Sequence, residues 1–368
     1  MFSRHRLLCK ACNEEDWSRS EKVSFTNWHP LAFPSRILRR DMSSEHNNPR
    51  NPIRIGSRGS QLALWQANHI LYALRDAGYH VELEIIRTTG DRMQQPGFVP
   101  PPNTDGKGIF IKEIEEALQE GRIDLAVHSL KDLPTQLAPQ FTLTAIPKRA
   151  DARDVWVCEP CWALNTLPDG GTIGTTSPRR RAQILALRPD VQFVEIRGNI
   201  DTRLKKLAAG QCDALVLAAA GLDRLKRTEA VHYRFSPEEL CPAPGQGALA
   251  LETRSATHPT DEARDAYIRQ AIAFLDHPHT RFAVEAERTT LDALGGGCSL
   301  PIGAHCIPPQ TPEGTWRMIA QVVAPDGEAM VHIDTEATYE TPACTLGNWV
   351  AEDLKSKGAL DLLPASGS

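Results

Sequence analysis

The chain has 368 residues, of which 41% are hydrophobic and 24% charged, and its formal net charge is −5. This composition indicates a globular protein of two or three domains and excludes a fibrous or a fully disordered one. No apolar run approaches the roughly 20 residues of a membrane span, and an acidic chain is poorly suited to coating nucleic acid phosphates. We therefore expect neither a membrane nor a nucleic acid as a partner.

Residues 1–50 differ from the rest of the chain, because they show no sustained hydrophobic period and no apolar core of a secretory signal. Their Arg and Ser content would suit an organelle transit peptide, but Glu14, Glu15 and Asp16 argue against one, since such peptides avoid acids. We interpret residues 1–50 as a flexible N-terminal extension and expect the protein to be cytoplasmic.

The nine cysteines are odd in number and irregular in spacing, which disfavours a secreted disulfide framework. Two C-x-x-C pairs, Cys9/Cys12 and Cys158/Cys161, are compatible with a zinc site if they act together. Nothing else in the chain resembles a zinc ribbon or finger, so we expect separate reduced thiols and no metal.

Strands and helices alternate from Ile53 onward. The first run predicts strand, helix, strand, helix and strand over residues 53–57, 62–74, 81–88, 108–121 and 123–130. A second run predicts the same alternation, with a return strand at its end, over residues 172–176, 177–189, 191–198, 202–210, 213–225 and 241–254. This alternation is typical of an α/β sheet with helical crossovers. A smaller α+β unit follows, with helices and strands over residues 282–297, 317–325, 329–337 and 345–358.

Residues 91–108 contain four prolines and no hydrophobic period. A loop of this length inside a compact domain is usually either a lid or a disordered segment. We favour a lid, because the loop ends in Gly-Lys-Gly just before a predicted helix.

Arginines occur at or just beyond the carboxyl ends of several predicted strands, where open α/β sheets bind ligands. They are Arg58, Arg179, Arg180, Arg181, Arg197 and Arg203. Ser177 is placed to cap the helix that Arg179 opens, and Pro178 suits its first turn. Free N–H groups and guanidinium groups would then form one anion site. A solvated basic helix start is the alternative for this motif, but the repeated placement favours a ligand with several carboxylates or phosphates.

The sequence contains neither a Walker loop nor a G-x-G-x-x-G turn, which disfavours nucleotides and favours a polycarboxylate. Lys131 and Asp132 directly follow a buried strand. An acid among these cations would stay ionised, offset a developing positive charge and move protons. A simple turn with Asp before a proline is the alternative.

Cys298 lies in the Gly-rich loop GGGCSLPIG, where a thiol is accessible for nucleophilic attack or for covalent attachment of a group. No His partner lies close in sequence, so a protease-like dyad is not indicated. Without further context, an inert loop cysteine is the alternative.

These features belong to seven motifs that follow one another in the chain: IRIGSRGSQLALWQA, GKGIFIKEIEEAL, DLAVHSLKDLP, GTTSPRRRAQ, RGNIDTRLKKL, CPAPGQGALALE and LGGGCSLPIGA. In this order they closely resemble the hydroxymethylbilane synthase family, also called porphobilinogen deaminase, from about Ile53 to the C-terminus. The resemblance implies an enzyme of tetrapyrrole biosynthesis that joins four porphobilinogen molecules head to tail and releases ammonia at each step. It also implies a dipyrromethane cofactor, bound by a thioether to Cys298.

The resemblance assigns roles to residues as follows. Asp132 would be catalytic, assisting the departure of ammonia, stabilising cations at the pyrrole nitrogens and relaying protons. The acetate and propionate groups of the pyrroles would be held by Arg58, Ser60, Lys131, Arg179, Arg180, Arg197 and Arg203. Supporting contacts would come from Lys107, Phe110, Ser129, Thr175 and Ser177. The lid departs from the family pattern. Family members often carry a second lysine and a paired glycine there, whereas this chain has Asn103 and Asp105 near those positions. Asp201 occupies a position that looks free to vary.

The family fold implies two lobes like those of periplasmic binding proteins and a small C-terminal α+β domain. The expected domains are 51–148 with 246–266, then 153–241, then 272–368, and the chain would cross between lobes near 148–153 and 241–245. No large apolar surface helix suggests an oligomer, so we expect a monomer. A non-catalytic two-lobed anion-binding protein is the competing hypothesis, and Cys298 and Asp132 argue against it.

Overall fold

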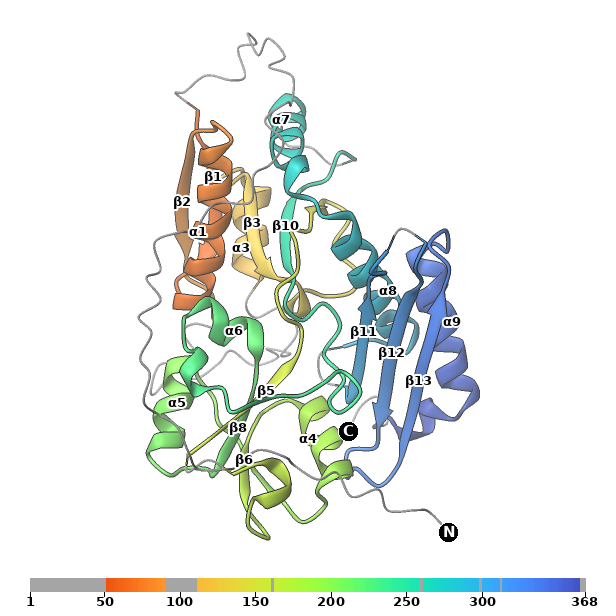
Figure 1. Ribbon diagram of the computed structural model, residues 1–368. Helices are drawn as coiled ribbons and strands as arrows, with labels where there is room; N and C mark the ends of the chain where they lie inside the picture. The colour runs from red at the N-terminus through yellow and green to blue at the C-terminus, as the bar shows by residue number, and fades with distance from the viewer. Residues whose placement is uncertain are drawn as a thin grey trace. The chain divides into compact units, whose positions relative to one another are not determined.

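The computed structural model describes residues 51–89, 111–159, 162–257, 261–297, 300–311 and 313–364. These residues form three β-sheets with helices packed against them (Figure 1). The predicted extension over 1–50 and the loop over 91–108 lie outside the described residues. The predicted fold class is confirmed, because two α/β lobes precede a small C-terminal α+β unit. Among the described residues, no helix has both the length and the apolar character to span a bilayer.

Lobe 1 contains a five-stranded sheet in the order β2-β1-β3-β10-β4. Its strands are β1 (Ile53–Arg58), β2 (Val81–Ile86), β3 (Leu125–Ser129), β4 (Phe141–Ala145) and β10 (Leu249–Arg254). Its helices are α1 (Gln61–Asp76), α3 (Lys112–Gln119) and α7 (Glu262–Ile272). The strands β1, β2 and β3 are parallel, whereas β10 is antiparallel to β3 and β4.

The helix α1 shows why this lobe folds as the sequence predicted. Its apolar residues Ala67, Ile70, Leu71 and Leu74 recur at helical spacing, and all four are buried against the sheet. Ser60 begins the helix, because its hydroxyl accepts a hydrogen bond from the Ala63 N–H. The functional consequence is that the carboxyl end of β1 and the start of α1 are fixed beside each other.

Lobe 2 contains a second five-stranded sheet, in the order β7-β6-β8-β5-β9. Its strands are β5 (Asp154–Cys158), β6 (Thr172–Gly174), β7 (Gln192–Val194), β8 (Ala214–Ala218) and β9 (Tyr233–Arg234). Its helices are α4 (Pro178–Leu187), α5 (Ile200–Ala208) and α6 (Ala219–Arg224). Ser177 caps α4 as predicted, since its side chain accepts a hydrogen bond from the Arg180 N–H at 3.4 Å.

The two sheets have the same topology. In lobe 1 the strand β10 lies between β3 and β4, and in lobe 2 the strand β5 lies between β8 and β9. Each inserted strand adjoins a crossing. The other four strands of each lobe, numbered along the chain, follow the same order of second, first, third and fourth. The chain crosses between the sheets after β4 and again after β9. Parallel strands therefore end at corresponding edges of both sheets, and side chains that follow them can converge on one ligand.

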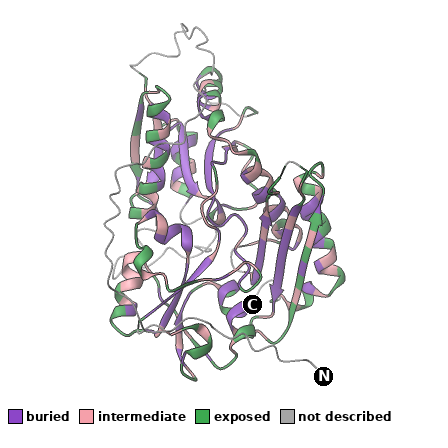
Figure 2. Cartoon of the chain, in the orientation of Figure 1, coloured by how far each residue is buried: buried purple, intermediate pink, exposed green. Residues whose placement is uncertain are grey.

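The C-terminal unit is a three-stranded antiparallel sheet covered by two helices that lie side by side (Figure 1). Its elements are α8 (Pro278–Ala293), β11 (Ile302–Ile307), β12 (Trp316–Val323), β13 (Met330–Ala337) and α9 (Ala343–Ser356). The strands are buried along the covered face while the outer faces of the helices are exposed (Figure 2). Trp316 and Met318 of β12 are in its core.

Short 3₁₀ turns connect these elements, namely η2 (Leu130–Asp132), η3 (Leu164–Thr166), η4 (Thr228–Ala230), η5 (Ala273–Leu275) and η6 (Ala359–Leu362). The most important for function is η2, because it follows β3 immediately and carries Lys131 and Asp132.

Several predicted elements differ from the structure in length. The strand predicted over 191–198 is only three residues long, because its partner β6 offers only Thr172–Gly174 for pairing. The helix predicted over 108–121 is described from Lys112, and Gly121, with a φ of 68°, follows its end as predicted. The helix α7 was not predicted, and neither were four strands, which are β4, β5, β9 and β11.

A buried carboxylate links both crossings to the C-terminal unit. Glu287 of α8 is fully buried and pairs with Arg149 of the first crossing. It also accepts hydrogen bonds from the backbone N–H groups of Gly245, in the second crossing, and of Cys306, in β11. Burial alone would raise its pKa, but the charge of Arg149 and a hydrogen bond from His305 lower the pKa of Glu287 to about 2.

Candidate active site

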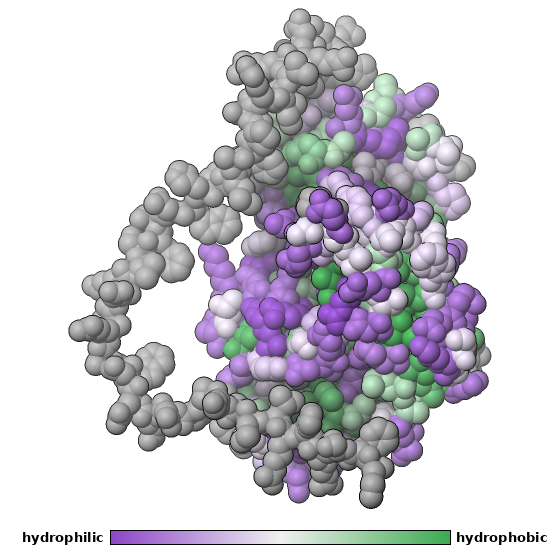
Figure 3. Space-filling model, turned by 45° about the vertical axis from the view of Figure 1, so that its right-hand side comes forward, coloured by the Kyte–Doolittle hydropathy of each residue, from purple (hydrophilic) through white to green (hydrophobic). Residues whose placement is uncertain are grey.

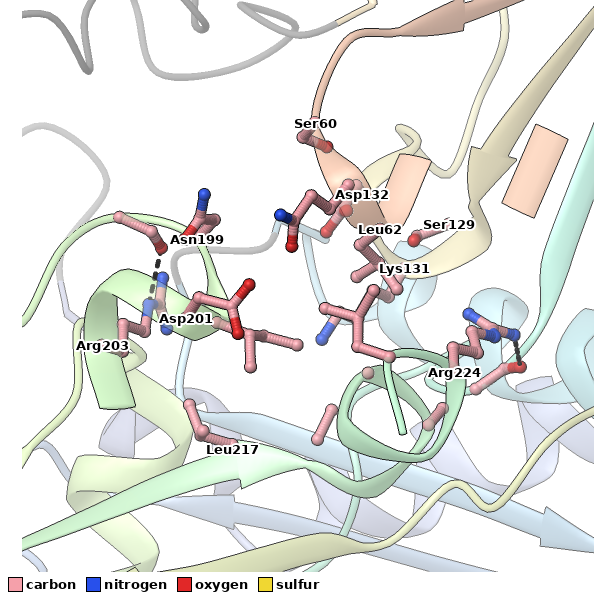
Figure 4. Close-up of a pocket in the computed structure, with 18 of the residues that line it drawn as sticks. Ser60, Leu62, Ser129, Lys131, Asp132, Asn199, Asp201, Arg203, Leu217 and Arg224 are labelled. Carbon is pink, nitrogen blue, oxygen red and sulfur yellow. Dashed lines mark hydrogen bonds between the residues drawn. The ribbon is translucent and has the colours of Figure 1, made fainter. Parts of the chain in front are cut away.

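A cavity of about 310 Å³ lies between lobe 1 and lobe 2. Its lining contains five cations and two carboxylates, which are Arg58, Lys131, Arg180, Arg203, Arg224, Asp132 and Asp201. Figure 4 shows Ser60 and Asp132 toward the top of the cavity, Arg203 at its left, and Ser129, Lys131 and Arg224 at its right. This excess of positive charge makes the cavity suited to a polyanion.

Lobe 1 supplies its residues from the carboxyl ends of two neighbouring strands. Arg58 ends β1, and Ser129 ends β3. The amide of Gln66 donates to the Ser129 hydroxyl at 2.8 Å and fixes its position. Lys131 and Asp132 follow at once in η2, so the buried strand β3 delivers both side chains to the rim of the cavity.

Lobe 2 supplies the guanidinium groups of the buried Arg224 and the half-buried Arg203, which form no ion pair among the described residues. The Arg203 Nε donates to the Gly198 carbonyl at 2.8 Å, and an Arg224 Nη donates to the Gly247 carbonyl at 2.7 Å (Figure 4). Burial lowers the pKa of Arg203 and lowers the pKa of Arg224 to about 10. Both groups remain charged at neutral pH, and a ligand carboxylate would relieve the cost of burying them.

Arg179 and Arg180 differ from these two, because a buried carboxylate already compensates them. Asp154, the first residue of β5, accepts from Arg179 at 2.7 Å and from Arg180 at 2.6 Å. Although burial alone would raise it, the two guanidinium groups hold the pKa of Asp154 below its usual range. The three side chains thus form a rigid charged group with a net positive charge at the edge of the cavity.

Lys131 is partly buried beside this group, and its ammonium points into the cavity (Figure 4). It donates to the side-chain oxygen of Gln246 at 3.3 Å. Burial and the charge of Arg180 lower the pKa of Lys131 to about 8, against the opposing effect of Asp132. The Lys131 ammonium therefore loses its proton as the pH rises through about 8.

A second, smaller cavity adjoins the first and reaches the C-terminal unit. It shares Lys131, Asp132 and Arg180 with the first cavity. Gly297 and Leu300 also line it. Cys298 itself, together with Ser299, lies outside the described residues.

The predicted site residues fall into three groups. The first cavity is lined by Arg58, Ser60, Ser129, Lys131, Asp132, Arg180 and Arg203, and the second also by Ser177 and Arg179. Thr175 and Arg197 line neither cavity: the Thr175 hydroxyl accepts from the Ser177 N–H at 3.2 Å, and the exposed Arg197 pairs with Glu195. Lys107, Phe110 and Cys298 lie outside the described residues.

Sequence reasoning missed Arg224 and Gln246, and it treated Asp201 as free to vary although this carboxylate lines the cavity. Arg224 follows β8 by six positions on α6, so the same strand-end rule that selected the other arginines applies to it. Gln246 gave no signal, because an uncharged side chain in a turn has no chemical signature of its own.

The described cysteines are free thiols: Cys158, Cys212, Cys241 and Cys306 are buried and Cys344 is exposed. Cys158 donates to the Trp162 carbonyl, and its C-x-x-C partner Cys161 lies outside the described residues. No group of three potential metal ligands occurs in the part of the chain that the structure describes.

Comparison with solved structures gives only weak likenesses. The chain is similar to the methionine-binding protein MetQ with a TM-score of 0.38 and 14% identity, covering 61% of this chain and 90% of that one. A periplasmic sulfonate-binding protein from Methylobacillus flagellatus has a TM-score of 0.34.

Comparison of sequences is decisive. The model of the porphobilinogen deaminase dipyrromethane cofactor-binding domain matches residues 53–262, and that of the porphobilinogen deaminase C-terminal domain matches residues 281–356. The chain is 45% identical to porphobilinogen deaminase from Acidothermus cellulolyticus, over 85% of this chain and 91% of the relative. It is 41% identical to that from Sulfurimonas denitrificans, over 84% and 95%. The chain therefore belongs to the porphobilinogen deaminase family.

Proposed function

We propose that the cation-lined cavity between the lobes is where this chain condenses four porphobilinogen molecules into hydroxymethylbilane, a transferase reaction of tetrapyrrole biosynthesis that releases ammonia. The observation that carries this assignment is the set of five cations around Asp132. Porphobilinogen carries an acetate and a propionate, so each added unit brings two carboxylates to a cavity whose own charges are mostly positive. A solute-binding protein is not favoured, because the family match extends over the C-terminal unit.

The donors of the cavity fit a dipyrromethane, whose side chains carry four carboxylates. Arg203 and Arg224 form no ion pair among the described residues, and Arg58 and Lys131 line the same cavity. We assign the carboxylates of cofactor and substrate to these residues and to Arg180, with hydrogen bonds from Ser60 and Ser129. When bound, the dipyrromethane supplies the pyrrole carbon to which the first substrate unit is joined.

Asp132 is the proposed catalytic residue. Its carboxylate is exposed and lines both cavities together with Lys131 and Arg180. It is placed to accept a hydrogen bond from the aminomethyl group of porphobilinogen, to stabilise positive charge on the pyrrole nitrogen as ammonia leaves, and to take up a ring proton.

Residues outside the first cavity have secondary roles in this proposal. Ser177 and Thr175 hold the start of α4, where Arg179 and Arg180 stand. Arg197 is exposed beside Gly198, which lines the cavity, so we assign it to carboxylates of the lengthening product at the cavity rim. Lys107 and Phe110 keep the roles that the resemblance implies, in the lid and against a cofactor ring.

We assign the cofactor thioether to Cys298. The support is that Gly297 and Leu300, which flank it, line the cavity that also contains Asp132. The intact mass of the purified protein should exceed the sequence mass by one dipyrromethane. Cys298→Ser should lack this addition, whereas Cys344→Ser, which alters an exposed thiol, should retain it. An added mass that survives Cys298→Ser would contradict the assignment.

The function itself is tested by incubating the purified protein with porphobilinogen. We expect one ammonia released for each porphobilinogen consumed, together with hydroxymethylbilane. Binding of porphobilinogen without release of ammonia would instead support the solute-binding alternative.

For the domains we propose 51–148 with 246–266, 153–241 and 272–368. The three separate sheets support this division. Ile268 and Ile272 of α7 pack in the core of the first sheet, which favours carrying the second segment on to the end of that helix.

We also propose a cytoplasmic monomer. Free thiols among the described residues suit a reducing compartment. Exposed large hydrophobic residues are spread over several elements, and Figure 3 shows hydrophobic colour in separate patches among hydrophilic ones. Light scattering of the eluted protein should give the mass of one chain, and a dimer mass would contradict this.

A further inference from the structure

Gln246 is a fully buried residue directly after the second crossing, and its side-chain amide makes three hydrogen bonds. Its oxygen accepts from the Lys131 ammonium at 3.3 Å. Its nitrogen donates to the Ala152 carbonyl at 2.7 Å and to the Asp154 carboxylate at 2.9 Å. Both N–H bonds of the amide are therefore used, and its oxygen is directed at a cation.

The backbone of this turn is fixed as well. The Gln246 carbonyl accepts from the Arg149 Nε at 2.7 Å, and its N–H donates to the Ala243 carbonyl at 2.9 Å. The next residue, Gly247, has a φ of 85°, and a Cβ there would lie 2.7 Å from the Ala150 carbonyl oxygen. The turn thus lies tightly against the first crossing, and the amide of Gln246 has little freedom to move.

The amide joins charges of opposite sign that come from different lobes. On the lobe 1 side is the Lys131 ammonium, next to Asp132 in η2. On the lobe 2 side is the Asp154 carboxylate, which holds Arg180. The orientation is favourable at both ends, because the amide oxygen faces the cation and the amide N–H faces the anion. A flipped amide would be unfavourable at both.

We propose that Gln246 is a positioning residue for the reaction: its amide fixes the Lys131 ammonium of lobe 1 relative to the Asp154–Arg180 pair of lobe 2, so that both cations are held at the spacing that the pyrrole carboxylates need. This inference rests on the proposed function of the cavity. It extends that function, because it assigns a role to a side chain at the boundary between the lobes. Gln246 is not proposed as a further ligand of the carboxylates.

The proposal predicts how Lys131 titrates when Gln246 is replaced. The charged groups that face the ammonium are Asp132 from η2, Arg179 and Arg180 from α4, and Asp154 from β5. Gln246→Met removes the acceptor and leaves the two guanidinium groups opposing the ammonium. Gln246→Glu keeps an acceptor and adds a negative charge.

The test is competitive acetylation of Lys131 in the holoenzyme from about pH 6 to about pH 10, quantified by peptide mass spectrometry. We expect the titration midpoint of Lys131 to fall by about one pH unit in Gln246→Met and to rise by about one in Gln246→Glu. The alkaline limb of kcat/KM should move in the same two directions, with kcat/KM of Gln246→Met at least about tenfold lower near neutral pH. Gln321→Met is the matched control, because Gln321 is an equally buried amide in β12 that makes no described contact with Lys131.

The outcomes separate the possible roles. A merely structural role would lower the melting temperature of Gln246→Met and Gln321→Met alike and leave the Lys131 midpoint unchanged, which would overturn the proposal. A Lys131 that does not react at any pH would overturn it too, because the ammonium would then not face the cavity. The labelling result does not depend on turnover, so an inactive protein with shifted midpoints would contradict the proposed function and not the position of Gln246.

Discussion

At the residue scale, the site is built from cations in two different states. Arg179 and Arg180 are neutralised in part by Asp154, and so they are held rigidly whether or not a ligand is bound. Arg203 and Arg224 have only backbone carbonyls as described hydrogen-bond partners, and so each keeps a full charge for a ligand. The contrast follows from where carboxylates lie in the fold, and it leads us to expect the larger share of the binding energy for a carboxylate ligand from the second pair.

Removing one of these unpaired charges should weaken substrate binding more than it alters the fold. A charge-assisted hydrogen bond contributes about 1.5–3 kcal/mol, so Arg203→Gln and Arg224→Gln should each raise KM by about 10-fold or more. Arg317→Gln, on β12 and paired with Asp334, is the control and should leave KM unchanged. Steady-state kinetics on porphobilinogen measure this, and equal KM values in all three variants would contradict it.

The pKa of Lys131 predicts a pH dependence. Because burial and Arg180 lower it to about 8, the ammonium that binds carboxylates is lost as pH rises through that value. KM for porphobilinogen should therefore increase above about pH 8. Lys131→Arg, whose charge does not titrate in this range, should show no such rise even if its kcat is lower. The same rise in this variant would assign the effect to another group.

At the element scale, the start of α4 is the clearest example of local sequence determining local structure. Ser177 caps the helix and Pro178 occupies its first turn, and Ser177 and Arg180 both line the second cavity. The sequence alone predicts this, because capping depends on residues that are neighbours in the chain. The helix face of α1 is predictable for the same reason.

Replacing the cap separates helix stability from anion binding. Ser177→Ala should lower the free energy of unfolding by about 1 kcal/mol, because the Arg180 N–H loses its acceptor. Ser177→Asp should restore the cap and the stability, yet raise KM, since it adds a negative charge where carboxylates bind. Thermal unfolding and KM measured on both variants test this, and a Ser177→Asp enzyme with an unchanged KM would exclude the helix start from the anion site.

Other elements depend on partners that are distant in the chain, and these escaped prediction. The strand β7 ends at Val194 because β6 offers only three residues for pairing, although its sequence continues in a strand-like pattern. The pairing of Asp154 with Arg180 joins positions on different elements of lobe 2, and Gln246 contacts Lys131, which is 115 positions away in the chain. Such contacts are set by tertiary packing, which no local pattern encodes.

At the scale of the whole molecule, Glu287 connects the C-terminal unit to both crossings. Its carboxylate pairs with Arg149 and accepts from the Gly245 N–H. The two crossings are the segments through which the chain passes from one lobe to the other. A single buried charge therefore joins both crossings to the C-terminal unit.

Glu287→Gln should destabilise the protein strongly, by about 3–5 kcal/mol, because Arg149 would be left buried without its carboxylate. The pKa of Glu287 is lowered to about 2 from 4.5, so its contribution is complete above about pH 4.5 and is lost as pH falls toward 2. The difference in unfolding free energy between wild type and Glu287→Gln should shrink over that range. A deficit that stays constant down to pH 2 would show that the charge of Glu287 is not responsible.

In the proposed function the chemistry is carried by Asp132, which follows β3 in η2 and lines a cavity with five cations. The most direct test of this role is the turnover of Asp132→Asn, measured on protein whose intact mass shows the dipyrromethane still attached. We expect kcat to fall by about 100-fold or more, since loss of an acid–base group costs about two to four orders of magnitude. A kcat close to that of the wild type would place the catalytic group elsewhere.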